Sequence, residues 1–184
     1  MKKPVVIIVL APGFEEVEAI TPVDILRRAG AEVVVAGLDK VLVTGAHGIA
    51  ISCDALLADI MSRTYDAVIL PGGLPGAKNL AASSNVRALL DSVQASGGYL
   101  SAICASPAYV LGTLGYLAGR KATGYPGTEV MAPGIDFVDQ PVVVDGRIVT
   151  SRGVGTALDF ALTLVELLFS RNAAKELAAT VLHS

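Results

Sequence analysis

The stretch GYLSAICASPAYVL, residues 98–111, joins a short apolar run to a helix start, with Cys104 at the junction. The apolar run follows the turn signal Gly97-Gly98 and predicts a buried strand. Ser106 is a good N-cap residue and Pro107 suits the first helical position, so a helix is expected to follow directly. A cysteine at this point lies among unpaired N–H groups at the positive end of the helix dipole, which favours the reactive thiolate. The stretch predicts a strand–nucleophile–helix elbow, with a small buried core cysteine as the alternative.

Length and hydropathy predict one domain without a membrane span. The 184 residues are enough for one well-buried core, so we expect a single domain over residues 1–184. Mean hydropathy is +0.61, yet no run approaches the roughly 18 apolar residues that a spanning helix needs. Lys2 and Lys3 precede the apolar run Val5–Leu10, but Ala11-Pro12-Gly13 ends that run early. This pattern predicts a buried strand rather than a secretory signal, a cytoplasmic location and no membrane partner.

Charge and residue usage exclude several classes of function. The net charge is −3, no basic cluster is present and tryptophan is absent, so no nucleic-acid partner is expected. Cys53 and Cys104 form no C-x-x-C pair, and in a chain without an export signal we expect both to stay reduced. With His47 and His183 as the two histidines, no metal site is expected.

The first 37 residues predict a βαβ unit. The β-branched run over residues 5–10 is typical of a strand covered on both faces. A helix over 15–29 has acidic residues in its first turn and Arg27-Arg28 in its last, and Gly30 ends it. A second buried strand over 32–37 follows, and a strand–helix–strand unit of this kind requires a parallel sheet.

The rest of the chain extends the alternation of strands and helices. The other predicted elements are a hairpin at the sheet's edge over 41–53, a loop with a short helix over 54–65, strands over 67–70, 99–103 and 121–123, a hairpin over 141–151, and helices over 84–96, 156–170 and 172–182. The predicted fold class is α/β, with a doubly wound, mostly parallel sheet, helices on both faces and added β-hairpins. Such sheets bind ligands outside the carboxyl ends of their strands.

Four positions lie at such strand ends: Phe14, Gly72-Gly73, Cys104 and Tyr125. The glycine turn allows backbone N–H groups to approach a ligand closely. The chain order therefore brings these positions to one crevice, in which Cys104 is the strong nucleophile.

A cysteine nucleophile usually has a histidine base, but neither histidine is well placed here. His47 lies in a hairpin turn and His183 is the penultimate residue, where chain ends tend to fray. Acidic residues are the other candidates for a proton-transfer partner. A solvated helix start, which favours acid, is sufficient to explain Glu15 and Glu16.

Glu18 has a more apolar helical surrounding than its acidic neighbours. Phe14, Pro22 and Ile25 lie at i−4, i+4 and i+7 from it. A carboxyl group buried beside a thiol has a raised pKa, so it can stay protonated and hydrogen-bond the thiolate or shuttle a proton. The alternative is an ordinary acidic residue of the helix start.

Six motifs resemble a known family. They are Gly13–Glu18 (GFEEVE), Pro22–Asp24 (PVD), Arg27–Gly30 (RRAG), Val68–Gly73 (VILPGG), Ala102–Pro107 (AICASP) and Thr150–Gly153 (TSRG). Together they resemble the ThiJ/PfpI superfamily, best the branch of the Parkinson-disease-associated protein deglycase and bacterial YajL, over nearly the whole chain and in the right order. The resemblance implies a flavodoxin-like sandwich, a homodimer and no cofactor.

The resemblance also implies roles for particular residues. It implies an oxidation-sensitive nucleophile at Cys104, a protonated partner at Glu18, and an anion or oxyanion pocket formed by backbone N–H groups near Gly72, Gly73 and Ala105. Tyr125 stands where many members have a histidine, so it replaces a base by a residue that can at most donate a hydrogen bond.

Two related activities do not fit these residues. The protease-like branch has a histidine directly after the cysteine, where this chain has Ala105, so a peptidase is not expected. The class I glutamine amidotransferases need a downstream His-x-Glu pair, which is absent.

Two functions remain from different classes. The resemblance implies a glyoxalase or deglycase that acts on methylglyoxal, a small dicarbonyl, or on its adducts with glycated proteins, through the pair of Cys104 and Glu18. The alternative is a redox-sensing stress protein or chaperone in which Cys104 is oxidised with little turnover. A degenerate member whose role lies at its surface is a third reading.

Overall fold

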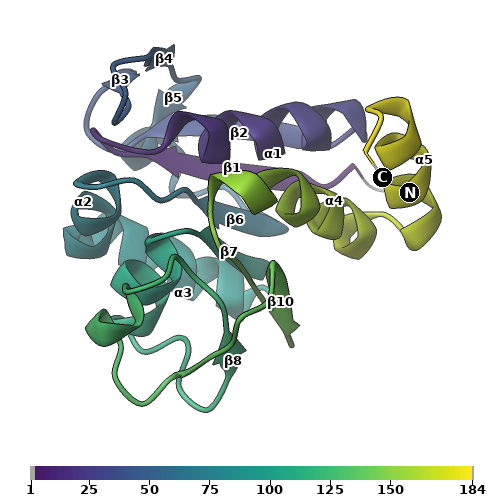
Figure 1. Cartoon of the computed structure of the whole chain (residues 1–184). Helices are drawn as coiled ribbons and strands as arrows, with labels where there is room; N and C mark the ends of the chain where they lie inside the picture. The colour runs from purple at the N-terminus through teal and green to yellow at the C-terminus, as the bar shows by residue number, and fades with distance from the viewer. Residues whose placement is uncertain (1–2, 184) are drawn as a thin grey trace.

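The computed structural model describes residues 3–183. Its centre is a seven-stranded sheet in the order β10-β11-β7-β6-β1-β2-β5, with helices on both faces (Figure 1). The strands are β1 (Val5–Leu10), β2 (Glu32–Gly37), β5 (Ala55–Leu56), β6 (Ala67–Leu70), β7 (Tyr99–Ile103), β10 (Val142–Asp145) and β11 (Ile148–Ser151). Only β10 and β11 pair antiparallel in this sheet, within the described residues. The predicted α/β class is confirmed.

The central strands are buried on both faces, as the β-branched runs predict. In β1, Val6 and Ile8 belong to one apolar core, whereas Ile7 and Val9 belong to another. Successive side chains of a strand point to opposite faces, so one strand supplies both cores.

The two cores lie under different helices. On one face are α1 (Glu16–Arg28), α4 (Ala157–Leu168) and α5 (Arg171–Thr180), and on the other are α2 (Gly76–Ala82) and α3 (Ser84–Ala95) (Figure 1). No helix within residues 3–183 is both long enough and apolar enough to cross a membrane.

Several short elements differ from the sequence-based prediction. The first hairpin, β3 (Leu42–Thr44) and β4 (Ala50–Ser52), forms its own two-stranded sheet rather than the edge of the large one. The edge is the two-residue strand β5, which falls in a segment predicted to be a loop and is followed by a short 3-10 helix (Leu57–Ile60). Helix α2 was not predicted, because it is short and begins at a glycine.

The remaining elements lie around the second hairpin. A two-stranded parallel sheet joins β8 (Lys121–Ala122) to β9 (Asp136–Phe137), and a 3-10 helix (Glu129–Met131) lies between them. The hairpin of β10 and β11 is part of the large sheet, with β11 parallel to β7 in the register Ser151↔Ile103. This pairing places the loop after β11 next to the end of β7.

Candidate active site

Cys104 lies in a strained backbone conformation directly after β7. Its φ is +65°, in the left-handed region that residues other than glycine rarely adopt. Two hydrogen bonds fix this conformation: the Cys104 N–H donates to the Ser151 carbonyl at 3.0 Å, and the Cys104 carbonyl accepts the Tyr125 N–H at 2.8 Å. Strain of this kind persists only where surrounding contacts hold it, and it is common at active sites. The predicted elbow at Cys104 is confirmed as a backbone feature.

The helix after the elbow differs from the expected one. It is a π-helix over Pro107–Gly112, with Pro107 at its first position as predicted. Ser106 does not cap it through its side chain. Instead the buried Ser106 hydroxyl donates to the Pro71 carbonyl at 2.6 Å, so Ser106 ties the elbow to the turn after β6.

Glu18 is fully buried in the first turn of α1. Its Oε2 accepts the Gly72 N–H at 2.9 Å, while its Oε1 has no hydrogen-bond partner among the described residues. The burial of Glu18 is therefore as predicted. The Gly72 amide, however, is already used by Glu18, which corrects its expected place in an oxyanion pocket.

Glycine at position 72 is required because three groups converge on it. A Cβ atom built on Gly72 would lie 2.6 Å from the Cys104 Cβ, 2.8 Å from Glu18 Oε2 and 3.0 Å from the Ala105 N. These separations are shorter than van der Waals contact allows, so any side chain here would displace the cysteine, the carboxyl group or the backbone. Elements far apart in the sequence are brought together at this point.

The pKa of each group in the pair is raised. The pKa of Glu18 is raised to about 7, mainly by burial and to a smaller extent by repulsion from Glu15, while hydrogen bonds from Cys104 and Gly72 act in the opposite direction. The pKa of the Cys104 thiol is raised to about 12, mainly by burial and also by the neighbouring Glu18 carboxylate.

The amides of Gly73 and Ala105 lower the pKa of the Cys104 thiol, but they do not outweigh burial and the carboxylate. The position of Cys104 at the start of a helix predicts a lowered thiol pKa and a stabilised thiolate. This expectation is wrong, because burial and the Glu18 carboxylate raise the thiol pKa instead. The first proton leaves the pair near pH 7, and the second is retained to alkaline pH. The Cys104–Glu18 pair therefore carries at most one negative charge near neutrality.

Cys104 and Glu18 face a cavity of about 590 Å³, whose walls also include Gly73 and Tyr125. Tyr125 is 55% exposed, and a Cβ built on Gly153 would lie 3.5 Å from its ring. The crevice predicted from the strand ends is present, although Phe14 is fully buried in the core rather than part of its lining.

Sequence reasoning missed the wall formed by the loop after β11. Arg152, Gly153, Val154, Gly155 and Thr156 all line the cavity. Arg152 forms an ion pair with Asp139. Tyr125 was identified as a candidate because ligands bind beyond the carboxyl ends of strands. The same rule applies to the loop after β11, so the sequence did contain a signal for it.

Neither histidine lines the cavity. His183 pairs through Nε2 with Asp159 at 2.8 Å, and His47 lies in the turn between β3 and β4. The expectation of a solvated helix start is wrong for the acidic residues near His47, because Glu15 and Glu16 are only 9% and 5% exposed. Glu15, Glu16 and His47 form the one group of possible metal ligands found among residues 3–183.

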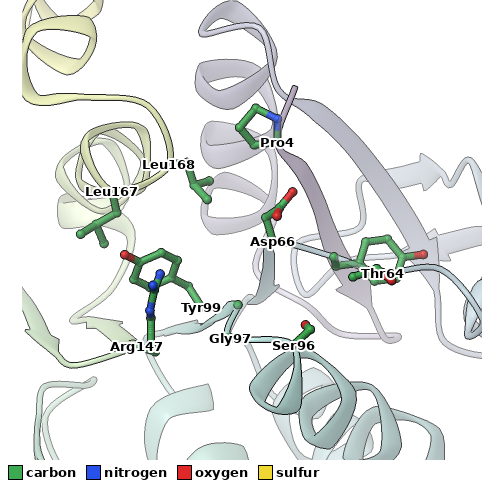
Figure 2. Close-up of a pocket in the computed structure, with 11 residues that line it drawn as sticks. Pro4, Thr64, Asp66, Ser96, Gly97, Tyr99, Arg147, Leu167 and Leu168 are labelled. Atoms are coloured by element: carbon green, nitrogen blue, oxygen red, sulfur yellow. The ribbon is translucent and has the colours of Figure 1, made fainter. Parts of the chain in front are cut away.

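A second cavity, of about 240 Å³, lies at the opposite end of the parallel strands (Figure 2). Its lining includes Pro4, Asp66, Tyr99 and Arg147, which lie at the starts of parallel strands. The Arg147 guanidinium stacks on the Tyr99 ring, 4.5 Å from its centre. The lining contains no cysteine or histidine, so this cavity is not the candidate active site.

The fold and site define an α/β protein with a strained elbow cysteine beside a buried carboxyl group. A model of the DJ-1/PfpI family matches residues 4–167. The chain belongs to the DJ-1/PfpI family, which confirms the resemblance identified from its motifs.

Three relatives show the extent of the similarity. DJ-1 homolog A of Arabidopsis thaliana is 42% identical over 96% of this chain and 46% of its own length, so the chain spans about half of that relative. The glutathione-independent glyoxalase DJR-1.2 of Caenorhabditis elegans is 39% identical over 84% of this chain and 82% of its own. The solved structure of oxidized Toxoplasma gondii DJ-1 covers 98% of this chain and 99% of its own, with 41% identity and a TM-score of 0.95.

Proposed function

We propose that the chain is a cofactor-independent glyoxalase or deglycase that acts on methylglyoxal or its protein adducts through Cys104 and Glu18. The observation that carries this proposal is the convergence of Cys104, Glu18 and the Ala105 amide around Gly72. A nucleophile, a proton carrier and an oxyanion donor are the three groups that the reaction needs. The name of the Caenorhabditis elegans relative supports the same class of reaction.

The first step is addition to the aldehyde. The Cys104 sulfur forms a bond to the aldehyde carbon, and the carbonyl π-electrons move to oxygen, giving a hemithioacetal. The thiol proton passes to the Glu18 carboxylate when that group is ionised, and Glu18 then delivers it to the new oxyanion, which completes the hemithioacetal and leaves Glu18 ionised for the next step. The amides of Gly73 and Ala105 already face the sulfur and are in position to stabilise the developing oxyanion.

The second step moves hydrogen between neighbouring carbons without an external oxidant. Glu18 removes the proton from the former aldehyde carbon, and a proton is returned to the adjacent carbon through an enediol, which leaves a lactoyl thioester on Cys104. Water then cleaves the thioester, releasing lactate and the free thiol. The sum is methylglyoxal plus water giving lactate, so the second carbon is reduced as the first is oxidised.

The test follows methylglyoxal loss and lactate appearance in thiol-free buffer. We expect wild-type turnover that is lost in Cys104→Ser, which lacks the thiol nucleophile, and reduced at least about 100-fold in Glu18→Gln, which is the usual size of an acid–base contribution. A wild type that is inactive, or no faster than Cys104→Ser, contradicts the proposal. Slow wild-type turnover is expected, because Tyr125 supplies no base.

A second candidate function is supported by the partly exposed, strained Cys104. The Toxoplasma relative was solved in a form titled oxidized. In a redox sensor, peroxide oxidises the Cys104 thiolate to the sulfenic and then the sulfinic acid, with two peroxides reduced to water. Intact mass after mild peroxide treatment tests it: addition of two oxygens confined to Cys104, with altered dimer stability or partner binding, supports the sensor, and no addition rejects it.

We also propose a homodimer that acts in the reducing cytoplasm, where Cys53 and Cys104 remain free thiols as they are in this structure. Exposed apolar residues on α1, Val17 at 46% and Ile20 at 40%, support a contact between two copies.

A further inference from the structure

The turn between β3 and β4 folds over the start of α1 and brings His47 to two carboxylates. The Gly13 N–H donates to the Thr44 carbonyl at 2.9 Å, and the Ala46 N–H donates to the Phe14 carbonyl at 2.7 Å. A Cβ built on Gly45 would lie 2.4 Å from Glu16 Cδ. Glycine at position 45 is therefore what permits this close approach.

Glu16 has one carboxylate oxygen fixed by the backbone and the other directed at the imidazole. Its Oε1 accepts the N–H groups of His47 at 2.7 Å and Ile49 at 3.3 Å. Its Oε2 lies 2.9 Å from His47 Nδ1. The backbone thus orients the carboxylate and leaves one oxygen available to a shared ligand.

Glu15 likewise has one carboxylate oxygen fixed by a backbone N–H group, but its other oxygen, Oε1, accepts no hydrogen bond from the described residues. Oε2 accepts the Glu18 N–H at 2.7 Å. Oε1 takes part in no hydrogen bond among the described residues, although Glu15 is only 9% exposed, and it lies 3.9 Å from His47 Nδ1. An ion pair between His47 and Glu16 explains the first carboxylate but leaves this oxygen, on a Glu15 side chain that is 12% exposed, without a partner among the described residues. A carboxylate that has lost most of its contact with water is stabilised by a cation or a donor beside it.

We propose that Glu15, Glu16 and His47 bind one divalent transition-metal ion of the zinc type. Their three ligand atoms lie within 4.8 Å of one another. Ligands about 2.0–2.2 Å from zinc are about 3.0–3.5 Å apart. The spacing between His47 Nδ1 and Glu16 Oε2 is already close to this range. The spacing between His47 Nδ1 and Glu15 Oε1 needs a shift of less than about 1 Å, which a turn residue with a side chain 71% exposed can make.

The donor set selects the class of ion. One imidazole nitrogen and two carboxylate oxygens suit Zn²⁺ or Mn²⁺ rather than a soft, thiolate-seeking ion. Three protein ligands leave a fourth position for water, and the exposed His47 gives the ion a path from solvent. Glu15 also lines the cavity that contains Cys104, so an ion here borders the candidate active site.

The test titrates the chelator-stripped full chain with Co²⁺, a coloured substitute for Zn²⁺, and then displaces it with Zn²⁺. We expect one Co²⁺ per chain, a visible band of nitrogen and oxygen ligation, and no thiolate charge-transfer band in the near ultraviolet. His47→Gln is expected to weaken Co²⁺ binding at least tenfold, with unchanged thermal unfolding in the absence of metal because the side chain is exposed. Glu16→Gln is expected to weaken binding as well.

Two variants control for other ligands. His183→Gln removes the other histidine, and Cys104→Ser removes the nearest thiol, so both are expected to bind Co²⁺ as the wild type does. Binding that survives His47→Gln unchanged, binding lost in Cys104→Ser, a thiolate band, or no binding at millimolar Co²⁺ each overturns the proposal. These measurements do not depend on turnover, so they are independent of the proposed glyoxalase reaction.

Discussion

Glu18 is ionisable, fully buried and only partly hydrogen-bonded, and this combination determines its proton affinity. Its charged form loses solvation and gains one amide donor, from Gly72, while Oε1 gains none. Desolvation therefore exceeds the stabilisation by hydrogen bonds, and the pKa rises to about 7. A carboxyl group with this pKa exchanges its proton near neutrality, as a proton carrier must.

The raised pKa of Glu18 predicts a pH-dependent stability. Below about pH 4.5 the carboxyl group is protonated in both the folded and the unfolded chain, so the stabilising effect is fully present. As the pH rises towards the folded-state pKa of about 7, the unfolded chain ionises first and this effect is lost. Relative to Glu18→Gln, the wild type should lose about 2 kcal/mol of unfolding free energy between pH 5 and pH 8.

Urea unfolding of both proteins at several pH values measures this difference. The contributions of the other titrating groups to the unfolding free energy are the same in both proteins, so they cancel in the comparison. Parallel curves for wild type and Glu18→Gln would show that Glu18 ionises at its ordinary pKa. The acid–base role proposed for Glu18 would then lose its basis.

At the scale of elements, the contact between the elbow and the turn after β6 positions the site. The Ser106 hydroxyl is buried and donates to the Pro71 carbonyl at 2.6 Å. Ser106→Ala removes this donor and should destabilise the fold by about 1–3 kcal/mol. It should also reduce any turnover, because the elbow and the Gly72-Gly73 turn lose their direct connection.

Ser101 provides a matched control for Ser106. It is equally buried, in β7, but its hydroxyl has no partner among the described residues. Ser101→Ala should be neutral or stabilising in urea unfolding, since it removes an unsatisfied polar group. Equal destabilisation by the two substitutions would contradict a specific role for the Ser106 contact.

The elements that the sequence predicts well are those with strong local signals. Continuous β-branched runs predict β1 and β2 to the residue. The apolar period predicts a helix over 84–96, and the observed α3 ends one residue earlier, at Ala95. The strand β5 has two residues and α2 has seven, so neither is long enough to show a period. Tertiary contacts, rather than local preference, stabilise both.

Prediction of the site was likewise limited to features that follow from local sequence signals and from the order of elements, and it failed for features that depend on tertiary contacts. The strand-end rule places Cys104 and Tyr125 at one cavity because it concerns topology, and topology follows from the order of elements. The donor to Glu18 is 54 residues away, at Gly72, and the burial of Glu15 and Glu16 depends on a turn some 30 residues later. No local pattern contains such contacts, so the pairing of Gly72 and the surroundings of both acids could not be predicted.

At the scale of the whole molecule, one face of α1 remains substantially exposed among residues 3–183. Val17 and Ile20 are three residues apart, so they lie on the same side of the helix, and both are substantially exposed. Ile20 also lines a surface groove with Leu158 of α4. Exposed apolar residues that cluster on a helix, next to a groove, are typical of a protein–protein contact.

A second copy of the chain is the partner that we propose for this face. Sedimentation of the wild type should give twice the chain mass of 18.8 kDa. Ile20→Glu and Val17→Asp should shift the protein to monomer, because a charge buried in an interface without a partner is costly. Val130→Glu is the control, since Val130 is 73% exposed in a 3-10 helix away from α1. A monomeric wild type would reject the dimer, and a dimer that survives both α1 substitutions would assign the contact to a different face.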